Sequence, residues 1–481
     1  MLFNSAAFAV FLLAVYLLYW SIGSKQFRLQ NVLIVLASYV FYSWWDWRFL
    51  GLLILSTLLD FTYGFWVASP DRRKARLFLW LSIINNFGIL ALFKYYNFFA
   101  SEFATFMASF GWEVHPYLLT WGLPVGISFY TFHGMSYVFD IYNGRQKPIG
   151  NFVHYAAFVC YFPLLVAGPI ERANHLLPQF LKPRVFDMEL AKDGLRQMLW
   201  GFFKKLVMAD GCAIVVDRIY QHGDYSELGS MNLLFAAVFF TFQIYGDFSG
   251  YSDIAMGCSK LFGIQILRNF NYPFFSRNIA EFWRRWHLSL SSWFRDYLYY
   301  PLGGSQNGKW IAIRNTLLVF FVSGFWHGAN WTFIIWGILH GLLFAPLIFT
   351  GANRKFTDVP DQGKVFPSIG NIGRMLLTFI LVTLLFVLFR AESMPQAGTF
   401  LQAMISTPGK NPGALLLWLT STPMIFALIV LAFEWVAREK VHGLDIAGMP
   451  AFRRRLIYMS ILACIIFFKQ LESQEFIYFQ F

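Results

Sequence analysis

Long runs of apolar residues, each near the length of a membrane-crossing helix, recur through this 481-residue chain. A spanning helix needs roughly 20 mostly apolar residues. The runs predict spans near residues 2–22, 31–47, 49–68, 77–93, 231–244, 311–325, 331–349, 375–388, 415–433 and 456–468. The alternating pattern of membrane barrel strands is missing from the sequence. We therefore predict an all-α, polytopic transmembrane bundle of about ten to twelve spans, forming a single domain over residues 1–481.

Two kinds of interruption lie between these runs. Pro124 stands between glycines in the apolar segment 122–129, and prolines recur in segments 161–163 and 167–172. Proline interrupts a helix, and a broken helix at membrane depth persists only inside protein or beside a water-filled cavity. These segments predict re-entrant or interfacial pieces. Residues 185–197 predict an amphipathic helix on the membrane surface, and the polar residues 351–370 an exposed loop.

Composition supports a membrane protein: 57% of residues are hydrophobic and 13% charged, whereas soluble proteins carry about 25% charged residues. The formal net charge is +12. The basic run from Arg72 to Arg76 predicts a cytoplasmic loop by the positive-inside rule. Basic residues are scattered between apolar spans, which disfavours nucleic acid as a partner. The first 20 residues contain no Lys or Arg, which favours a retained first helix over a signal peptide.

His327 is the leading candidate for chemistry, because an ionisable residue within an apolar bundle is a functional-site hypothesis by default. Asn330 and Trp331 follow at i+3 and i+4, and would share its face if the segment is helical. An asparagine there could hold one ring nitrogen and leave the other free as a base. The alternative is a buried neutral imidazole bonded to a carbonyl. Gly324 and Gly328 would let another backbone or a ligand approach closely.

His287 is the second candidate. Arg284 and Ser291 lie at i−3 and i+4, which predicts that both share its side of a helix. Glu281 and Arg285 predict an i,i+4 ion pair on the same helix. The alternative is an interfacial helix that places its tryptophans and arginines at headgroup level.

Other polar residues have simpler interpretations. His340, 13 residues after His327, is predicted to be a packed histidine. Arg295 and Asp296 predict a structural ion pair. Asp247 and Asp253, beside an apolar run, are costly unless paired or hydrated. Their predicted partners are Arg268, Arg277 or Arg284, or a polar path that the carboxylates line. The four cysteines are predicted to be small core residues.

The segments 283–296 and 325–331, with Trp336-Gly337, closely resemble the signature of the membrane-bound O-acyltransferase family. Within it, the chain resembles the bacterial branch that O-acetylates exported polysaccharides such as alginate. Further matches are residues 1–5, 122–130, 167–172, 246–253 and 476–481. The resemblance covers nearly the whole chain, so its implications apply to the fold as well as to the site.

The resemblance implies a helical bundle crossed by a central tunnel, in a bacterial inner membrane. His327 matches the family's catalytic histidine, and His287 matches a second position occupied by His or Asn. It also implies acetyl-CoA as a cytoplasmic donor substrate, no bound cofactor, and an extracytoplasmic polysaccharide acetyltransferase as partner. Candidate substrate- or tunnel-lining residues are Trp326, Asn330, Trp331, Arg284, Ser291 and Asp247.

Three alternatives stay open at this point. Within the family, the chain could transfer D-alanine to teichoic acid. Broken helices and midplane carboxylates also occur in transporters, although the sequence has no inverted repeat. A scaffold for a polysaccharide secretion complex would need neither histidine.

Overall fold

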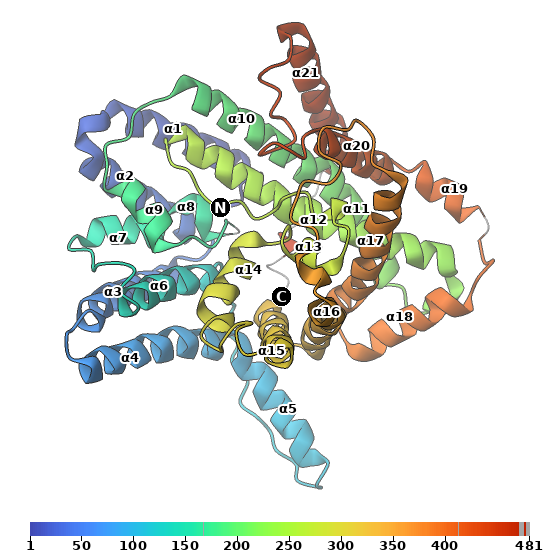
Figure 1. The fold of residues 1–481 in the computed structure, drawn as a ribbon, viewed down its shortest axis with the longest axis horizontal. Helices are drawn as coiled ribbons and strands as arrows, with labels where there is room; N and C mark the ends of the chain where they lie inside the picture. Colours follow the sequence, from blue (N-terminus) through green and yellow to red (C-terminus); the bar gives the residue numbers. More distant parts are fainter. Residues whose placement is uncertain (167, 412, 471–475, 478–481) are drawn as a thin grey trace. The chain divides into compact units, whose positions relative to one another are not determined.

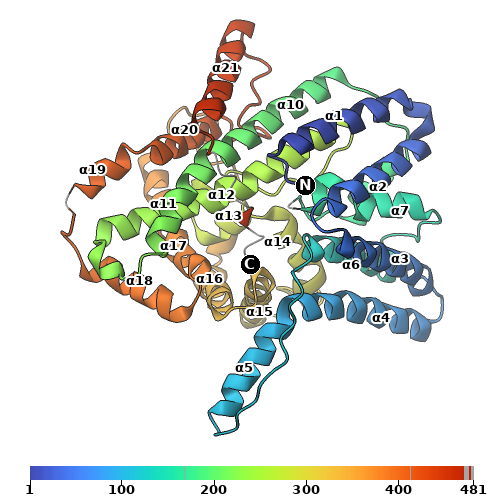
Figure 2. The same cartoon turned by 180° about the vertical axis from the view of Figure 1, so that it is seen from behind.

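The computed structural model describes all residues except 167, 412, 471–475 and 478–481. The described chain is helical and contains no strand, which confirms the predicted all-α class (Figures 1 and 2). It divides into two compact units. The first comprises residues 1–194 with 258–267, and the second comprises residues 195–257 with 268–481. The helices α10 (Met188–Phe203) and α12 (Ser230–Leu261) each have residues in both units.

The first unit is built on the packed helices α3 (Leu50–Val67), α4 (Arg72–Leu90) and α6 (Ile127–Tyr142). Gly134 of α6 lies against Asp60 of α3, where a β-carbon would collide with the carboxylate. Ser82 and Asn86 of α4 donate hydrogen bonds of 2.8 Å to that carboxylate. The remaining helices of this unit are α1 (Ala6–Ser21), η1 (Ser24–Gln26), α2 (Phe27–Ser43), η2 (Trp47–Phe49), η3 (Ala91–Tyr95), α5 (Tyr96–Ala108), α7 (Phe152–Val159), α8 (Phe162–Leu165) and α9 (Ala173–Phe180).

One helix of the first unit is unusually long. Residues Arg72–Ala108 form a continuous 37-residue helix through α4, η3 and α5. The middle piece, η3, is a π-helix, a feature that commonly bends a helix. Beyond it, α5 turns away from α3, α4 and α6 (Figures 1 and 2). Asn97 exchanges two hydrogen bonds of 2.8 Å with the backbone of Leu119, so the returning chain runs beside α5.

The proline-containing segments of the first unit interrupt its helices, as predicted. Around Pro124 the chain is not helical, and α6 begins only after Gly126, whose φ is +73°. The segment from 152 to 180 forms the short helices α7, α8 and α9. None is long enough to cross a membrane alone. Residue 167, the first of the 167–172 motif, lies outside the described residues.

The second unit contains His287, His327 and the other candidate site residues. Its helices α15 (Lys309–His327) and α16 (Trp331–Thr350) pack closely through glycines, because β-carbons at Gly324 and Gly337 would collide with backbone of the facing helix. The remaining helices are η4 (Lys204–Ala209), α11 (Asp210–Tyr220), η5 (Tyr225–Glu227), η6 (Pro273–Phe275), α13 (Ile279–Trp283), α14 (Leu288–Phe294), η7 (Arg295–Tyr299), η8 (Ala352–Arg354), α17 (Ile369–Arg390), α18 (Met394–Ser406), α19 (Ala414–Leu419), α20 (Thr422–Val436) and α21 (Ala451–Phe468).

Fewer helices qualify as membrane spans than the sequence predicted. Within the described residues, five are long and apolar enough, or six if the pair Ala6–Ser21 and Ser24–Ser43, bent by 105°, forms one span. The predicted run 415–433 is split into α19 and α20, the latter only 15 residues long. The predicted run 456–468 belongs to α21, which begins at Ala451 and carries three arginines at 453–455. Apolar runs thus overestimate the number of membrane-spanning helices where the chain turns within a run or where charged residues belong to the same helix.

Two further predictions concern α10 and the residues after it. The predicted amphipathic helix at 185–197 exists, as α10, but extends to Phe203. The apolar run after α10 contains Lys204 and Lys205, whose charges on their own would favour a position near a membrane interface. Both are buried in the second unit, where carboxylates of the same unit surround them.

Candidate active site

His327 is the last residue of α15 and is buried among aromatic rings. The centroid of its ring lies 4.9 Å from that of Trp326, 5.2 Å from Trp336 and 5.1 Å from Phe389. At Gly328 the chain becomes extended, and a β-carbon there would collide with the ring of Phe333. The predicted close approach at Gly324 and Gly328 is therefore confirmed. It places His327 at the end of a tightly packed helix pair.

Asn330 does not hold His327. The helix ends at His327, so Asn330 and Trp331 do not share its helical face as expected. Asn330 instead caps α16: its side chain accepts a hydrogen bond from the Thr332 backbone at 3.0 Å and donates to the Glu392 carbonyl at 2.8 Å. The ring of Trp331 is half exposed. The glycine at 328 breaks the helix that the spacing argument assumed.

His287 lies in a sharp turn between α13 and α14. Its backbone is left-handed, with φ +44° and ψ +54°, a conformation that costs a residue with a β-carbon about 1–2 kcal/mol. The side chain is 1% exposed, and neither ring nitrogen has a hydrogen-bond partner within the described residues. Burial lowers the pKa of His287 to about 3. A neutral imidazole there has one donor and one acceptor available for a substrate.

The indole of Trp326 lies between the two candidate histidines. Its ring centroid is 4.9 Å from that of His327 and 6.0 Å from that of His287. Phe248 closes the other side of His287 at 4.7 Å. The structure thus brings together His287, Trp326 and His327 in one aromatic environment. Electrostatic interactions with a reacting group are strengthened where water is excluded.

Arg284 and Ser291 line one large cavity, but not as the sequence argument expected. Because the chain turns at His287, the three residues do not occupy one helix face. The cavity, here called the deep channel, has about 1340 Å³ of empty space, part of it open to solvent. The guanidinium of Arg284 donates to the carbonyls of Asn353 and Phe356 at 2.7 and 2.6 Å. Ser291 donates to the carbonyl of Trp286 at 3.3 Å.

A second cavity, here called the basic mouth, adjoins the deep channel. It has about 990 Å³ of empty space, and Arg295, Tyr299, Ile348 and Asn353 line both cavities. Lys309 and Arg354 also line it. Arg295 pairs with Asp296 at 3.0 Å, as predicted. Three cationic side chains therefore surround the entrance.

The deep channel follows α15 toward His327. Ala312 lines the basic mouth and Ser323 lines the deep channel. Eleven residues of helix separate them, about 17 Å at 1.5 Å per residue. His327 lies about one turn beyond Ser323. The two cavities together extend along α15 from Lys309 to Ser323, and neither His287 nor His327 lines them.

Asp247 and Asp253 are paired, but with lysines that the sequence analysis did not select. Lys205 binds Asp247 and Asp210, each at 2.8 Å, and Lys204 binds Asp253 at 2.7 Å. The predicted arginine partners are wrong, since Arg277 binds Glu281 and Asp358 instead. The two adjacent lysines in an apolar run were the available signal, because such charges need carboxylates nearby.

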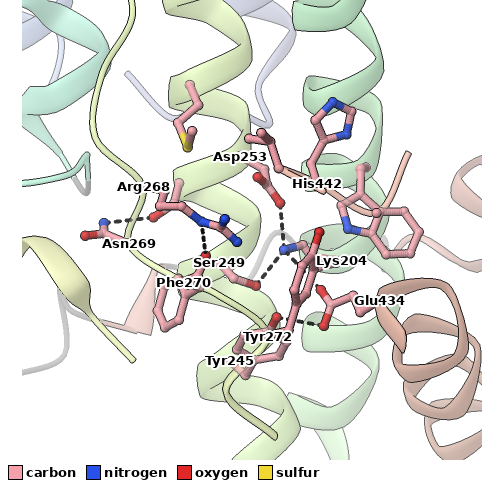
Figure 3. Close-up of a pocket in the computed structure, with 15 residues that line it drawn as sticks. Lys204, Tyr245, Ser249, Asp253, Arg268, Asn269, Phe270, Tyr272, Glu434 and His442 are labelled. Atoms are coloured by element: carbon pink, nitrogen blue, oxygen red, sulfur yellow. Dashed lines mark hydrogen bonds and ion pairs between the residues drawn. The ribbon is translucent and has the colours of Figure 1, made fainter. Parts of the chain in front are cut away.

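A small polar cavity lies beside this charge network, with about 330 Å³ of empty space, part of it open to solvent (Figure 3). Lys204 points into it and donates to Ser249 at 2.8 Å. Glu434, which sequence analysis missed, accepts a hydrogen bond of 2.8 Å from Tyr245. Asn269 lines the opposite part of the cavity (Figure 3). The cavity is formed by α12, η4 and α20 with the chain around 268–272.

His340 is packed, as predicted. Its Nδ1 accepts a hydrogen bond of 3.3 Å from the indole of Trp283, and its ring contacts that of Trp336 at 4.8 Å. The predicted Glu281–Arg285 ion pair is also confirmed, at 2.9 Å. Of the C-terminal motif 476–481, only Phe476 and Ile477 are described, and the Ile477 backbone donates to Asp247 at 2.7 Å. Residues 478–481 lie outside the described residues.

Comparison with known proteins adds to this geometry. The profile of the membrane-bound O-acyltransferase family matches residues 75–391. The chain is 39% identical to the probable alginate O-acetylase AlgI of Pseudomonas syringae pv. tomato, over 84% of this chain and 75% of that protein. It is 35% identical to the peptidoglycan O-acetyltransferase of Helicobacter pylori, over 78% and 74%. It is 30% identical to the teichoic acid D-alanyltransferase of Bacillus subtilis, over 50% and 62%.

Proposed function

The chain belongs to the membrane-bound O-acyltransferase family, and from that premise we propose that it passes an acetyl group from cytoplasmic acetyl-CoA across the membrane. The family assignment makes it a multi-pass membrane protein and an acyltransferase. The acceptor hydroxyl belongs to an extracytoplasmic partner that O-acetylates an exported polysaccharide such as alginate. The protein resides in a bacterial inner membrane and holds no resident cofactor. The observation that carries this proposal is that a large cavity extends along α15 as far as Ser323, about one helical turn before the buried His327.

The basic mouth and deep channel suit a phosphorylated thioester donor. Lys309 and Arg354 present charges that attract phosphate groups, beside Arg295, which is paired with Asp296. The depth of about 17 Å along α15 is comparable to an extended pantetheine arm, which would carry the thioester toward His327. Loop 351–368 beyond α16 contains Arg354, Lys355 and Lys364, which favours a cytoplasmic position by the positive-inside rule.

In the proposed reaction His327 is the general base. It takes the proton of the acceptor hydroxyl while the hydroxyl oxygen attacks the thioester carbonyl. The tetrahedral intermediate collapses, the carbon–sulfur bond breaks, and the proton passes from His327 to the departing thiolate. The products are an acetyl ester and free coenzyme A. An imidazole suits both proton transfers, because its ordinary pKa lies near neutrality.

His287 is the proposed donor to the developing oxyanion. It is neutral and has no other hydrogen-bond partner in the described structure. An oxyanion donor of this kind is worth about 3–4 kcal/mol in the transition state. Trp326, between the two imidazoles, excludes water that would otherwise hydrolyse the thioester.

The test is transfer of labelled acetyl from acetyl-CoA by the purified protein in lipid nanodiscs, with candidate partner proteins as acceptors. We expect His327→Ala to abolish transfer while the protein remains folded. We expect His287→Ala to lower the rate about 100-fold or more. A folded His327→Ala protein that transfers at the wild-type rate would refute the mechanism.

D-alanyl transfer is the second candidate function. The 30% identity to a teichoic acid D-alanyltransferase over half of this chain favours it. The same assay with D-alanine on a carrier-protein thioester separates the two. The greater identity and coverage of the O-acetylating relatives favour acetyl. Movement of D-alanine without movement of acetyl would reverse that choice.

A further inference from the structure

The left-handed turn at His287 is held by a short neighbouring segment, residues 269–271. The backbone N–H of Leu288 donates to the carbonyl of Asn269 at 2.8 Å, and the N–H of Asn271 donates to the carbonyl of Arg285 at 2.9 Å. These two bonds bracket Trp286 and His287. Helix-type bonds from Trp286 to Phe282 and from Ser291 to His287 hold the turn from within, and the bonds to residues 269–271 fix it from outside.

Asn269 also ties the turn with its side chain. Its Oδ1 accepts a hydrogen bond of 2.6 Å from the hydroxyl of Ser289, two residues after His287. Its Nδ2 donates at 3.0 Å to the hydroxyl of Ser252 on α12. The amide supplies one acceptor and one donor in a fixed plane. One buried side chain thus connects the start of α14 to the long helix α12.

The other end of this connection is firmly held. Ser252 lies in the same helix as Ser249 and Asp253, which Lys204 binds at 2.8 and 2.7 Å (Figure 3). Gln197 donates to Asp253 at 2.8 Å as well. The hydrogen-bond chain therefore runs from a buried ion pair through α12 and Asn269 to the turn. The proposed reaction does not use this buried polar network. Through Asn269, the network supports the turn that holds His287.

We propose that Asn269 is the positioning residue that fixes the left-handed turn of His287 and thereby aims its imidazole at the reacting carbonyl. This inference rests on the proposed role of His287 in acyl transfer. Asn269 touches neither donor nor acceptor. Its effect passes through the backbone of Leu288 and the hydroxyl of Ser289, and a displacement of about 1 Å at a reacting group lowers a rate about 100-fold.

The kinetic test compares Asn269→Ala with wild type in the acetyl-transfer assay. We expect kcat to fall about 10- to 100-fold, with little change in KM for acetyl-CoA. Asn269→Asp keeps the acceptor for Ser289 and should recover part of the loss. Ser289→Ala removes the same bond from the other side and should reproduce it. Asn232→Ala is the matched control, because Asn232 bonds Leu228 and Trp418 in the same unit.

A double-mutant cycle separates positioning from a general structural effect. If Asn269 acts through His287, Asn269→Ala should cost nothing further in a His287→Ala background. An equal fold-loss in both backgrounds would overturn the proposal, as would a folded Asn269→Ala protein with wild-type kcat. If Asn269→Ala does not fold, the same double-mutant cycle with Ser289→Ala tests whether the effect passes through His287.

A structural readout keeps this test independent of the reaction. The structure of the Asn269→Ala protein in nanodiscs should show residue 287 outside the left-handed region, or its imidazole turned. A turn unchanged from φ +44° would overturn the positioning role even if no acceptor supported transfer. Failure of the wild type with every donor and acceptor would instead refute the proposed function and leave this structural result standing.

Discussion

Lys205 and Asp247 form an ion pair of 2.8 Å in which both side chains are almost fully buried. Lys205 also binds Asp210 at 2.8 Å, and Asp247 accepts the backbone N–H of Ile477. Taking a charge out of water is costly, and its partners repay that cost only while all are present. The folding stability of the second unit should therefore be highly sensitive to substitution of either residue.

We expect Lys205→Met to destabilise the protein by about 3–5 kcal/mol, because it leaves two carboxylates buried without their cation. Adding Asp247→Asn should restore part of that loss. Thermal unfolding in nanodiscs measures both. The control is Lys192→Met, which breaks an exposed pair with Glu189 and should cost about 0–1 kcal/mol. Equal losses at the two lysines would contradict the argument.

The left-handed backbone at His287 predicts an unusual substitution pattern. Asparagine and glycine adopt positive φ more easily than other residues. We expect His287→Asn to unfold near the wild-type temperature, and His287→Val to lose about 1–2 kcal/mol. His222→Val is the control, since His222 is not among the described residues with positive φ. A His287→Val protein as stable as His287→Asn would argue against backbone strain at this position.

The close glycine contact between α15 and α16 predicts that adding a single methyl group there will lower the stability of the protein and the rate of transfer. Gly324→Ala places a β-carbon against the carbonyl oxygen of Phe333, which must move to make room. We expect a loss of about 1–3 kcal/mol and slower transfer, because His327 lies one turn further along α15. Gly373→Ala in α17 has open space around it and should stabilise by about 0.5–1 kcal/mol. Unfolding and transfer assays read out both variants.

The basic mouth predicts a phosphate-dependent donor affinity. We expect Arg354→Ala to raise KM for acetyl-CoA about tenfold with little change in kcat, because a lost phosphate contact weakens binding rather than chemistry. The effect should shrink with acetyl-dephospho-CoA if Arg354 meets the 3′-phosphate. Arg453→Ala, at the start of α21, is the control. A change in kcat alone would place Arg354 outside donor binding.

The ion pair of His175 predicts that the folding stability of the first unit depends on pH. Its Nδ1 lies 2.8 Å from Glu171, and this hydrogen bond raises the pKa of His175. The stabilisation is fully present below the unfolded pKa of about 6.5 and is lost as pH rises through the raised folded value. His175→Gln should lower the unfolding temperature by about 1–2 °C at low pH, with no difference above the raised pKa. A difference that grows with pH would contradict this sign.

His327 was selected from sequence because an ionisable residue in an apolar run needs an explanation, and His287 because it lies among tryptophans. Their surroundings were not identifiable in this way. The spacing of Arg284, His287 and Ser291 assumed one helix, but contacts from residues 269–271 impose a turn. Contacts distant in sequence also explain why the arginine partners predicted for Asp247 were wrong. Partners distant in sequence are chosen by the fold, which no local pattern reports.

The all-helical class and most helix positions followed from apolar runs, whereas helix ends and span number did not. Gly328 ends α15 directly after His327, and this break removed Asn330 from its predicted role. The central tunnel and the single-domain organisation stay predictions. The deep channel is a cavity within the second unit, and its length along α15 could not be read from periodicity.

The helix from Arg72 to Ala108 has a consequence for the bilayer around it. Its 37 residues extend about 55 Å, against a hydrocarbon thickness of about 30 Å, so it cannot cross in one straight line without hydrophobic mismatch. Because α5 turns aside beyond the π-helix η3, we expect this bend to relieve the mismatch. No Lys or Arg lies between Lys94 and Arg145, which favours the non-cytoplasmic side for this segment. The exposed phenylalanines of α5, from Phe99 to Phe106, are then expected to lie along the outer leaflet rather than across it.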